Sequence, residues 1–323
     1  MVHLRIVAPS DLTQRAVEIL ARTPAVCNLV VLRGAARRPP GDVILCDVAR
    51  EDASVVIDDL RELGIPRSGS IAVEEVDTYL SEQAERAVEA AQGLPTDAVV
   101  WEEVEERTAE SAVLSFTFLA FMVIAALIAA VGIYLDSAIL IVGAMVVGPE
   151  FGPIAGMCVA IVHPPRSLAL RSLLALAVGF VVAVIAVFWA TIIFKATGVT
   201  PDTFTGADHG LSTVIASPDF LSFFVAFCAG AAGMLSLTTA KSAALIGVLI
   251  SVTTLPAAAN IGVSSAYADW PAFRGSLTQL GLNLAAILLA GTLTLAIQRA
   301  LYERRKERHR REELAETAAE AAS

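Results

Sequence analysis

Apolar residues occupy most positions between 113 and 298, and this segment lacks the recurring polar face that a soluble helix turns toward water. A helix of roughly 20 apolar residues crosses a bilayer core about 30 Å thick. With that length as the measure, the segment predicts six transmembrane helices, at residues 113–135, 137–162, 168–194, 220–237, 243–264 and 277–298. We therefore predict an all-α membrane domain over residues 113–298.

The first 80 residues follow a different pattern, in which short apolar runs alternate with amphipathic ones. Strands are predicted at residues 3–8, 26–32, 43–48 and 71–76, and helices at 10–22, where Ser10 is the expected cap, and 51–63. A Gly/Pro/Arg-rich turn is expected over residues 34–41. The order β-α-β-β-α-β predicts a cytoplasmic α+β ferredoxin-like domain over residues 1–80. Because this fold hosts many functions, sensing of a small-molecule ligand and a docking or assembly role both stay open.

Charged segments flank the membrane domain on both sides. Residues 81–112 predict a helical connector in two pieces around residues 93–95, with a glutamate-rich second piece. Residues 299–323 predict a tail whose basic first part continues the last membrane helix. Basic residues next to a membrane helix are typical of contact with anionic lipid headgroups, so the bilayer is the expected partner and nucleic acid is not.

The composition separates the same parts of the chain. The chain is 56% hydrophobic and 17% charged, with a net charge of −10. Residues 1–112 hold 11 basic and 21 acidic residues, whereas residues 113–298 hold only 5 and 6. An uncharged middle behind an acidic front excludes a single soluble globule, a secreted disulfide-rich module and a disordered chain.

The positions of Lys and Arg predict the orientation in the membrane. If the front is cytoplasmic, the inside loops carry Arg166, Arg171 and Lys241, and the outside loops carry only Lys195 and Arg274. Cytoplasmic loops carry the excess of basic residues in membrane proteins. An even number of spans returns the tail to the side of the front. We therefore expect a multi-pass protein of the inner (plasma) membrane with both termini in the cytoplasm.

The membrane segment contains an internal repeat. Residues 136–141 read DSAILI and residues 241–246 read KSAALI, and each hexapeptide opens a span after a tight turn. Spans one to three therefore resemble spans four to six, and an odd number of spans per half makes the two halves inverted. Prolines and glycines interrupt the second and fifth spans at corresponding places. Inverted repeats with interrupted helices are typical of transporters whose site lies near the midplane.

These interrupted segments resemble a known family. The residues that carry the resemblance are Gly143-Ala144-Met145, Pro149, Gly152-Pro153-Ile154-Ala155-Gly156, Gly247-Val248-Leu249-Ile250, Leu255-Pro256, Gly262 and Asn283. They are similar to the bacterial membrane proteins of domain of unknown function 389 (DUF389). The resemblance implies a multi-pass bacterial inner-membrane protein with a soluble N-terminal part, and it implies no particular activity. The chain departs from the family pattern at Glu150 and at Ala257, which puts a shared role of Glu150 in doubt.

Glu150 is the acidic residue that lies within a predicted span. It is 14 residues from Asp136 and 13 from His163, which places it about 20 Å from either end of its helix. A charge at that depth costs at least about 2.5–3.5 kcal/mol, so such residues usually face a cavity. Glu150 is therefore a candidate proton carrier or cation ligand. The alternative is a protonated or hydrogen-bonded side chain that seals the broken helix.

Other polar residues in the spans are candidate ligands for an ion or a polar solute, and they are Thr253, Thr254, Asn260 and Asn283. The candidate helix breaks or hinges are Pro149, Gly152, Pro153, Gly156 and Pro256. Hydroxyls also satisfy the carbonyls that a kink frees, and glycines spaced four apart also pack helices closely, so each residue has a purely structural alternative.

Signatures of enzymes are missing from the sequence, which contains no HExxH, CxxC, nucleophile elbow or phosphate-binding glycine loop. We expect neither a cofactor nor a metal site, and the four cysteines are expected to be reduced. Two functions remain. The first is a transporter or channel for an ion or small polar solute, coupled to a proton or cation and regulated by the front domain. The second is a membrane-anchored sensor or oligomeric scaffold without transport, and either is expected to be a homo-oligomer.

Overall fold

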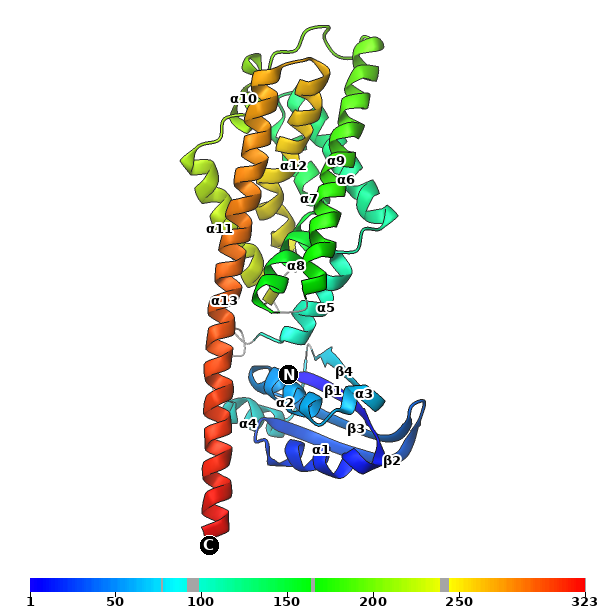
Figure 1. Cartoon of the computed structure of the whole chain (residues 1–323), viewed down its shortest axis with the longest axis vertical. Coiled ribbons are helices and arrows are strands. Elements are labelled where there is room, and N and C mark those ends of the chain that lie inside the picture. The colour runs from blue at the N-terminus through cyan, green and yellow to red at the C-terminus, as the bar shows by residue number, and fades with distance from the viewer. Residues whose placement is uncertain (77, 92–98, 164–165, 239–243, 323) are drawn as a thin grey trace. The chain divides into compact units, whose positions relative to one another are not determined.

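The computed structural model describes residues 1–76, 78–91, 99–163, 166–238 and 244–322 (Figure 1). The chain divides into two compact units. Unit 1 contains residues 1–104 together with 306–323, and unit 2 contains residues 105–305. The two units contain different kinds of structure, so each is described by itself.

Unit 1 is built around a small antiparallel sheet. Its elements are β1 (Val2–Ala8), α1 (Ser10–Arg22), β2 (Val26–Arg37), β3 (Pro40–Val48), α2 (Arg50–Glu62), α3 (Ile65–Ser68) and β4 (Ser70–Glu75). The strands lie in the order β2-β3-β1-β4, and every neighbouring pair is antiparallel. Apart from the added short helix α3, the order of strands and helices is the predicted one.

The core of unit 1 follows the alternation of the sequence. Val2, Leu4, Ile6 and Ala8 are buried on one face of β1, and the residues between them are partly or fully exposed. They pack with buried side chains of β3 and α2, which include Ile44. This period of two is typical of a strand with one buried face.

Two local predictions for unit 1 are wrong. Ser10 is not the cap of α1, because the helix begins at Ser10 itself and Pro9 precedes it without a side-chain bond. The expected turn over residues 34–41 is shorter, because β2 continues to Arg37 and β3 begins at Pro40. The backbone N–H of Gly34 donates to Asp42 Oδ1 at 2.7 Å and Gly34 has a φ of +62°, so an irregularity within the hairpin replaces the longer loop.

The connector is helical in two pieces, as predicted. Helix α4 (Glu82–Ala90) begins after Ser81, whose hydroxyl accepts the N–H of Ala84 at 3.3 Å. Helix α5 (Trp101–Ser111) follows, and the residues predicted to separate the two pieces, 93–95, lie outside the described part of the chain. The boundary between the two units falls within α5.

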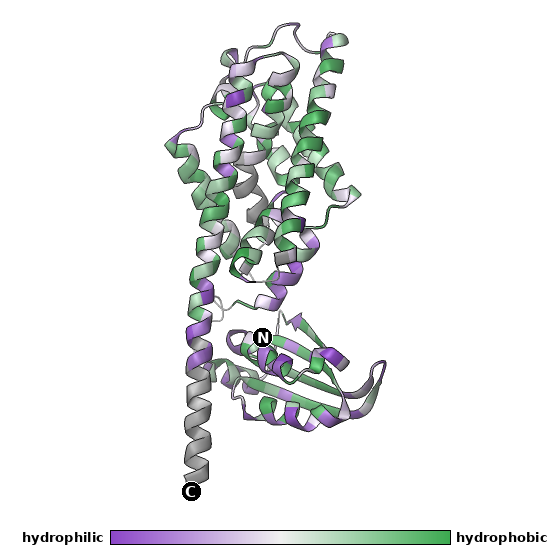
Figure 2. Cartoon of the chain, in the orientation of Figure 1, coloured by the Kyte–Doolittle hydropathy of each residue, from purple (hydrophilic) through white to green (hydrophobic). Residues whose placement is uncertain are grey.

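Unit 2 is helical. Its helices are α6 (Phe116–Tyr134), α7 (Ala138–Val147), α8 (Phe151–Val162), α9 (Arg166–Ala196), α10 (Gly210–Ile215), α11 (Phe220–Thr238), α12 (Ala244–Ala266) and the first part of α13 (Trp270–Ala322). Figure 2 shows hydrophobic residues along most of these helices. The tail was predicted to continue the last membrane helix. It is helical and forms the second part of α13.

The number of candidate membrane spans is four to five among the described residues, against six predicted. Helices α6, α9, α11 and α13 are long and apolar enough to cross a bilayer. The pair α7 and α8 adds a fifth span if the two helices, bent by 55°, are taken together. The segment predicted as span 243–264 is the 23-residue helix α12, and its side chains before Thr254 lie outside the described part. The chain is therefore a membrane protein with several helices of spanning length.

One of the two predicted helix breaks is wrong. Helix α12 continues through Pro256, whereas the second predicted span separates into α7 and α8. A single proline removes one N–H from a helix and can be accommodated as a kink. In the second span Gly148 comes before the proline and adopts an extended conformation with ψ of 129°. The glycine adds backbone freedom that Leu255, the residue before Pro256, does not have.

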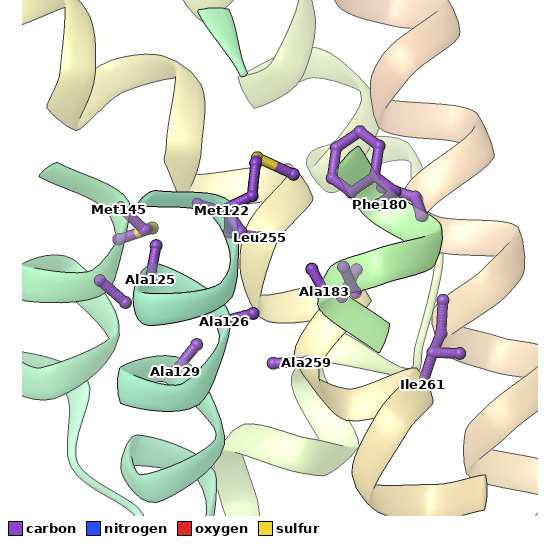
Figure 3. Packing of buried hydrophobic residues seen from close by; sticks show 14 of the residues in the cluster. Met122, Ala125, Ala126, Ala129, Met145, Phe180, Ala183, Leu255, Ala259 and Ile261 are labelled. Atoms are coloured by element: carbon purple, nitrogen blue, oxygen red, sulfur yellow. The ribbon is translucent and has the colours of Figure 1, made fainter. Parts of the chain in front are cut away.

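Small side chains let the helices of unit 2 approach closely. Figure 3 shows Met122, Ala125 and Ala129 of α6 among the buried residues of the core, with Met145 of α7 and Ala259 of α12 in the same cluster. Alanine and glycine at helix contacts are the usual means of association in membranes, because lipid gives no hydrophobic advantage to large apolar side chains.

A buried ion-site candidate at the helix break

The second predicted membrane helix is interrupted at residues 148–150. Helix α7 ends at Val147 and α8 begins at Phe151. Gly148 takes the extended conformation that the residue before a proline favours, and Pro149 has no N–H to donate. These two adjacent residues end α7, and the chain then turns into α8 at the bend of 55°.

Glu150 immediately precedes α8, and its side chain is 0% exposed. Thr254 of α12 donates a hydrogen bond from Oγ1 to Oε1 of Glu150 at 3.0 Å, across 104 residues of sequence. The N-terminal end of a helix favours a neighbouring carboxylate. A buried carboxylate also needs hydrogen-bond donors or a cation to offset the loss of water. The structure therefore brings together two of the predicted ligand residues, one at the helix break and one on α12.

The space beside Glu150 is tight. A Cβ atom added to Gly148 would lie 2.1 Å from Cδ1 of Leu255 and 2.3 Å from Oε2 of Glu150. Both distances are shorter than a van der Waals contact, so only glycine fits between α12 and the carboxylate. Gly148 therefore both ends α7 and allows the close approach of α12.

Three of the predicted hinges lie inside α8 and do not interrupt it. Pro153 is the third residue of this helix, where its missing N–H has no partner within the helix to lose. A Cβ on Gly152 would lie 2.4 Å from Cβ of Ser111, and one on Gly156 would lie 2.5 Å from Oγ of Ser172. These glycines pack α8 against α5 and α9, which is the structural alternative of the sequence analysis.

Asn260 belongs to a separate polar group. Its Oδ1 accepts a hydrogen bond from Oγ of Ser212 at 3.0 Å, and its Nδ2 donates to Oγ of Ser276 at 2.8 Å. All three side chains are buried, and they come from α12, α10 and α13. Six residues of helix, about 9 Å, separate Asn260 from Thr254. The structure therefore places Asn260 in a contact that joins three helices and does not place it at Glu150.

Asn283 and its neighbour Gln279 form a third polar contact. Nε2 of Gln279 donates to Oδ1 of Asn283 at 3.0 Å, and both residues are buried on α13. The side chain of Thr253 lies outside the described part of the chain. Of the predicted ligand residues, Glu150 and Thr254 thus share a hydrogen bond, whereas Asn260 and Asn283 contact other polar partners.

The residues that hold the loop between α9 and α11 were not predicted as contact residues from the sequence. Asp136 follows α6 and accepts the N–H of Leu211 at 2.7 Å, and Asp269 follows α12 and accepts the N–H of Gly206 at 2.8 Å. Phe204, at the centre of this loop, is buried in the core of unit 2. The two aspartates therefore tie one loop to the ends of two different helices.

Two tyrosines complete these contacts. The ring of Phe204 lies 5.6 Å from that of Tyr134 and 5.4 Å from that of Tyr267. Each tyrosine precedes one of the aspartates by two residues, so the pattern Tyr-x-Asp occurs at residues 134–136 and 267–269. This repeated pattern was the available signal for both contacts.

In unit 1 one face of α2 makes several polar contacts. Ser54 and Arg61 both bind Glu102 at the start of α5, with oxygen–oxygen and nitrogen–oxygen distances of 2.8 and 3.2 Å. Burial raises the pKa of Glu102, and the two partners act against that shift. Asp58, on the same face, accepts a hydrogen bond from Nζ of Lys306 of α13 at 2.6 Å. Helix α2 therefore holds residues of the two helices, α5 and α13, that continue into unit 2.

The comparisons with known proteins agree with the resemblance noted in the sequence. A comparison with curated proteins and another with solved structures give no match. The model of the family described as "Domain of unknown function (DUF389)" matches residues 145–289, from the end of α7 to the middle of the apolar part of α13. That segment contains Glu150, Thr254, Asn260 and Asn283. Residues 145–289 of the chain therefore match the DUF389 family.

Proposed function

We propose that the protein is a transporter or channel for an ion or small polar solute, coupled to a proton or cation. In this proposal α7 with α8 forms one span and α12 forms another, so that six spans result. Two inverted halves of three spans each then face one another, and α8 and α12 meet beside the midplane. This arrangement is the one in which transporters with inverted repeats carry their sites.

The observation that carries the proposal is the burial of Glu150 at a helix break, with Thr254 of another helix bound to it. An acidic side chain at membrane depth is expensive, and its ordinary roles are to carry a proton or to bind a cation. Non-helical backbone at that depth is tolerated where it lines a cavity or is buried in protein. The carboxylate of Glu150 therefore lies within the three residues that separate α7 from α8.

The mechanism proposed is alternating access. Glu150 has no exposed surface in this structure, so an ion reaches it only after helices around the break move apart. The bend between α7 and α8 supplies a flexible point, and the Thr254 hydrogen bond joins the two halves when the site is closed. Exchange of this hydrogen bond for a bound ion or a proton then shifts the population between closed and open states.

A flux measurement tests this function. The purified full-length protein is placed in liposomes, and movement of Na⁺, K⁺ and protons is recorded for the wild type and for Glu150→Gln. We expect the substitution to lower flux about tenfold or more, because the amide keeps the shape and loses the charge. Glu51→Gln is the matched control, since Glu51 is a buried glutamate of unit 1 and its change is expected to leave flux unaltered. Equal flux in wild type and Glu150→Gln contradicts the proposal.

The lysine and arginine distribution supports an orientation with both termini in the cytoplasm of a bacterial cell and the α9–α11 loop outside. In that orientation unit 1, with its β-α-β-β-α-β order, is a ferredoxin-like cytoplasmic domain. The small appended domain suits a homo-oligomer. Cross-linking in membranes and a protease-protection assay test the assembly and the orientation.

A second candidate function is that of a membrane-anchored sensor, and the face of α2 supports it. Because Ser54, Asp58 and Arg61 hold the start of α5 and Lys306 of α13, a ligand that displaces α2 alters both chain connections to unit 2. Thermal unfolding of the full chain against a metabolite panel tests this role. A stabilising ligand combined with no flux of any ion favours the sensor over the transporter.

A further inference from the structure

Helix α13 has a buried polar face within unit 2. Ser276, Gln279 and Asn283 are spaced three and four residues apart, which places them on one side of the helix. Their exposed fractions are 0%, 5% and 0%, whereas Leu277 between them is 52% exposed. A helix that shows apolar residues outward and polar ones inward is typical of a segment that lines a polar path through a membrane domain.

The hydrogen bond between Asn260 and Ser276 aligns this face with the Glu150 site. Helices α12 and α13 are joined by a short turn and run side by side in opposite directions (Figure 1). Thr254 lies six residues from Asn260, or about 9 Å along α12, and the same distance along α13 from Ser276 reaches about residue 282. Asn283 is therefore at about the depth of Thr254 and of the carboxylate bound to it.

Gln279 has an acceptor without a partner among the described residues. Its Nε2 donates to Asn283, while its Oε1 is buried and accepts no hydrogen bond from the part of the chain that the structure describes. A buried amide oxygen without a donor is destabilising, and few such groups persist in folded proteins without a functional reason. Amide and hydroxyl oxygens are the ligands that replace the hydration shell of a hard cation.

The charge of the Glu150 site and of the polar face of α13 indicates which class of cation they would bind. Along the described residues from Ser276 through Asn283 to Glu150 and Thr254, the one ionisable side chain is the carboxylate of Glu150. A single negative charge balances a singly charged cation. A divalent cation would leave one positive charge uncompensated in a medium of low dielectric constant, which is strongly unfavourable.

The outer end of the face is closed by the α9–α11 loop. Ser212 of this loop donates to Asn260, and Asn260 in turn donates to Ser276 at the end of the polar face. The Tyr-x-Asp pairs hold the same loop at Phe204, Gly206 and Leu211. A cation that moves along the face thus meets the Ser212–Asn260–Ser276 contact first and Gln279 next.

We propose that Ser276, Gln279 and Asn283 line the outer half of a path for a dehydrated monovalent metal cation, with Oε1 of Gln279 as a ligand on the way to Glu150. This inference rests on the proposed transport function and adds to it the ion class, the path and Gln279 as a selectivity residue. The loop that contains Ser212 is the outer closure of the path.

The test measures efflux of K⁺, Na⁺ and Ca²⁺ from liposomes that contain the full-length protein. We expect the wild type to move K⁺ or Na⁺ and not Ca²⁺, and we expect Gln279→Leu to raise the cation concentration for half-maximal flux about tenfold. Gln298→Leu is the matched control, because Gln298 is a second glutamine of α13, about 28 Å along the helix from Gln279. Its Nε2 donates to Thr238 at 2.9 Å, and its Oε1, like that of Gln279, has no partner among the described residues, so the two variants differ in their place along α13. Its substitution is expected to leave that concentration unchanged. Gln279→Met keeps the length of the side chain and repeats the test if the leucine variant does not fold.

The outcomes separate this inference from the function on which it rests. If the wild type moves no ion, the transport function fails. If the wild type moves monovalent cations and Glu150→Gln stops them, but Gln279→Leu and Gln279→Met behave like the wild type, the function stands and the path is wrong. Equal movement of Ca²⁺ overturns the monovalent assignment, and proton movement without K⁺ or Na⁺ overturns the metal cation as the carrier.

Discussion

Two prolines of the membrane unit have different effects on the helical segments around them. Pro149 lies in a complete break between α7 and α8, whereas Pro256 lies within the continuous helix α12. Gly148 precedes the first proline and adopts an extended conformation, while Leu255 precedes the second. The difference shows that a proline ends a membrane helix when its neighbours also release the backbone, and that it is otherwise absorbed into the helix.

The polar partners of the two helices differ as well. At the break, the carboxylate of Glu150 accepts a hydrogen bond from the hydroxyl of Thr254 on α12. On α12, Asn260 contacts both Ser212 and Ser276, and so connects three helices on the C-terminal side of Pro256. The broken helix therefore carries the charge, and the continuous helix carries the contacts that fix its position. The following four predictions test this division.

Asn260→Ala is expected to have the largest effect. It removes the buried hydrogen bonds of the Asn260 side chain and leaves the hydroxyls of Ser212 and Ser276 without this partner, at a cost of about 3 kcal/mol in the free energy of unfolding. Chemical denaturation of the detergent-solubilised protein measures it. The control is Thr278→Ala, because Thr278 is exposed on α13 and donates only to a carbonyl of its own helix. An equal loss in both variants would show that Asn260 does not hold α12.

Gly148→Ala is expected to destabilise by about 2 kcal/mol, because the added methyl group overlaps Leu255 and the carboxylate of Glu150. Gly143→Ala in the same helix is the matched control, since nothing lies within 4 Å of its added Cβ atom. The control is expected to be neutral or stabilising by about 0.5–1 kcal/mol, because alanine favours the helix. Denaturation curves of the two variants that coincide would contradict the close approach at the break.

Thr254→Val keeps the shape of the side chain and removes the hydrogen bond to Glu150. We expect a loss of about 1.5 kcal/mol, the value typical of a bond to a charged group, together with reduced ion flux in liposomes. Thr294→Val is the control, because Thr294 donates to a carbonyl within α13 and lies away from the break. A threonine contact that serves packing alone would alter the denaturation curve and leave flux as in the wild type.

Pro256→Ala is expected to have the smallest effect, below about 1 kcal/mol, because α12 is already helical on both sides of the proline. The alanine restores one N–H to the helix, which stabilises it. It also removes the packing of the ring, which destabilises it, so the two effects on the free energy of unfolding oppose each other. Hydrogen exchange of α12 amides measures the change in the backbone. A large gain of protection would show that Pro256 opens the helix as a hinge and would remove the contrast with the break.

Much of the fold follows from local patterns in the sequence. The period of two in β1 and the helical spacing in α1 and α2 depend only on residues close in the chain, and these elements lie within a residue of their expected bounds. The hydrophobic segments likewise predict helices of spanning length, because lipid requires about 20 apolar residues. The length of strands β2 and β3 was not predicted, because it depends on pairing between the two strands and on the hydrogen bond from the N–H of Gly34 to Asp42.

The candidate site was predictable in part. A charged residue within an apolar run is visible in the sequence, so Glu150 needed no structure to be selected. Its contact with Thr254 joins residues that are 104 positions apart, and no local pattern distinguishes Thr254 from other threonines of the spans. The same holds for Ser212, which reaches Asn260 only because a loop folds back onto α12.

Sequence alone determined that this chain has an acidic α+β front, a membrane domain of long apolar helices and a carboxylate within an apolar segment, because composition and periodicity depend on residues close together in the chain. Only the tertiary structure decided that Pro149 breaks a helix and Pro256 does not, that Thr254 contacts Glu150, and that Asn260 binds Ser212 of α10. Those outcomes depend on which neighbouring groups can satisfy a freed backbone or a buried charge, and the packing of distant segments supplies those groups.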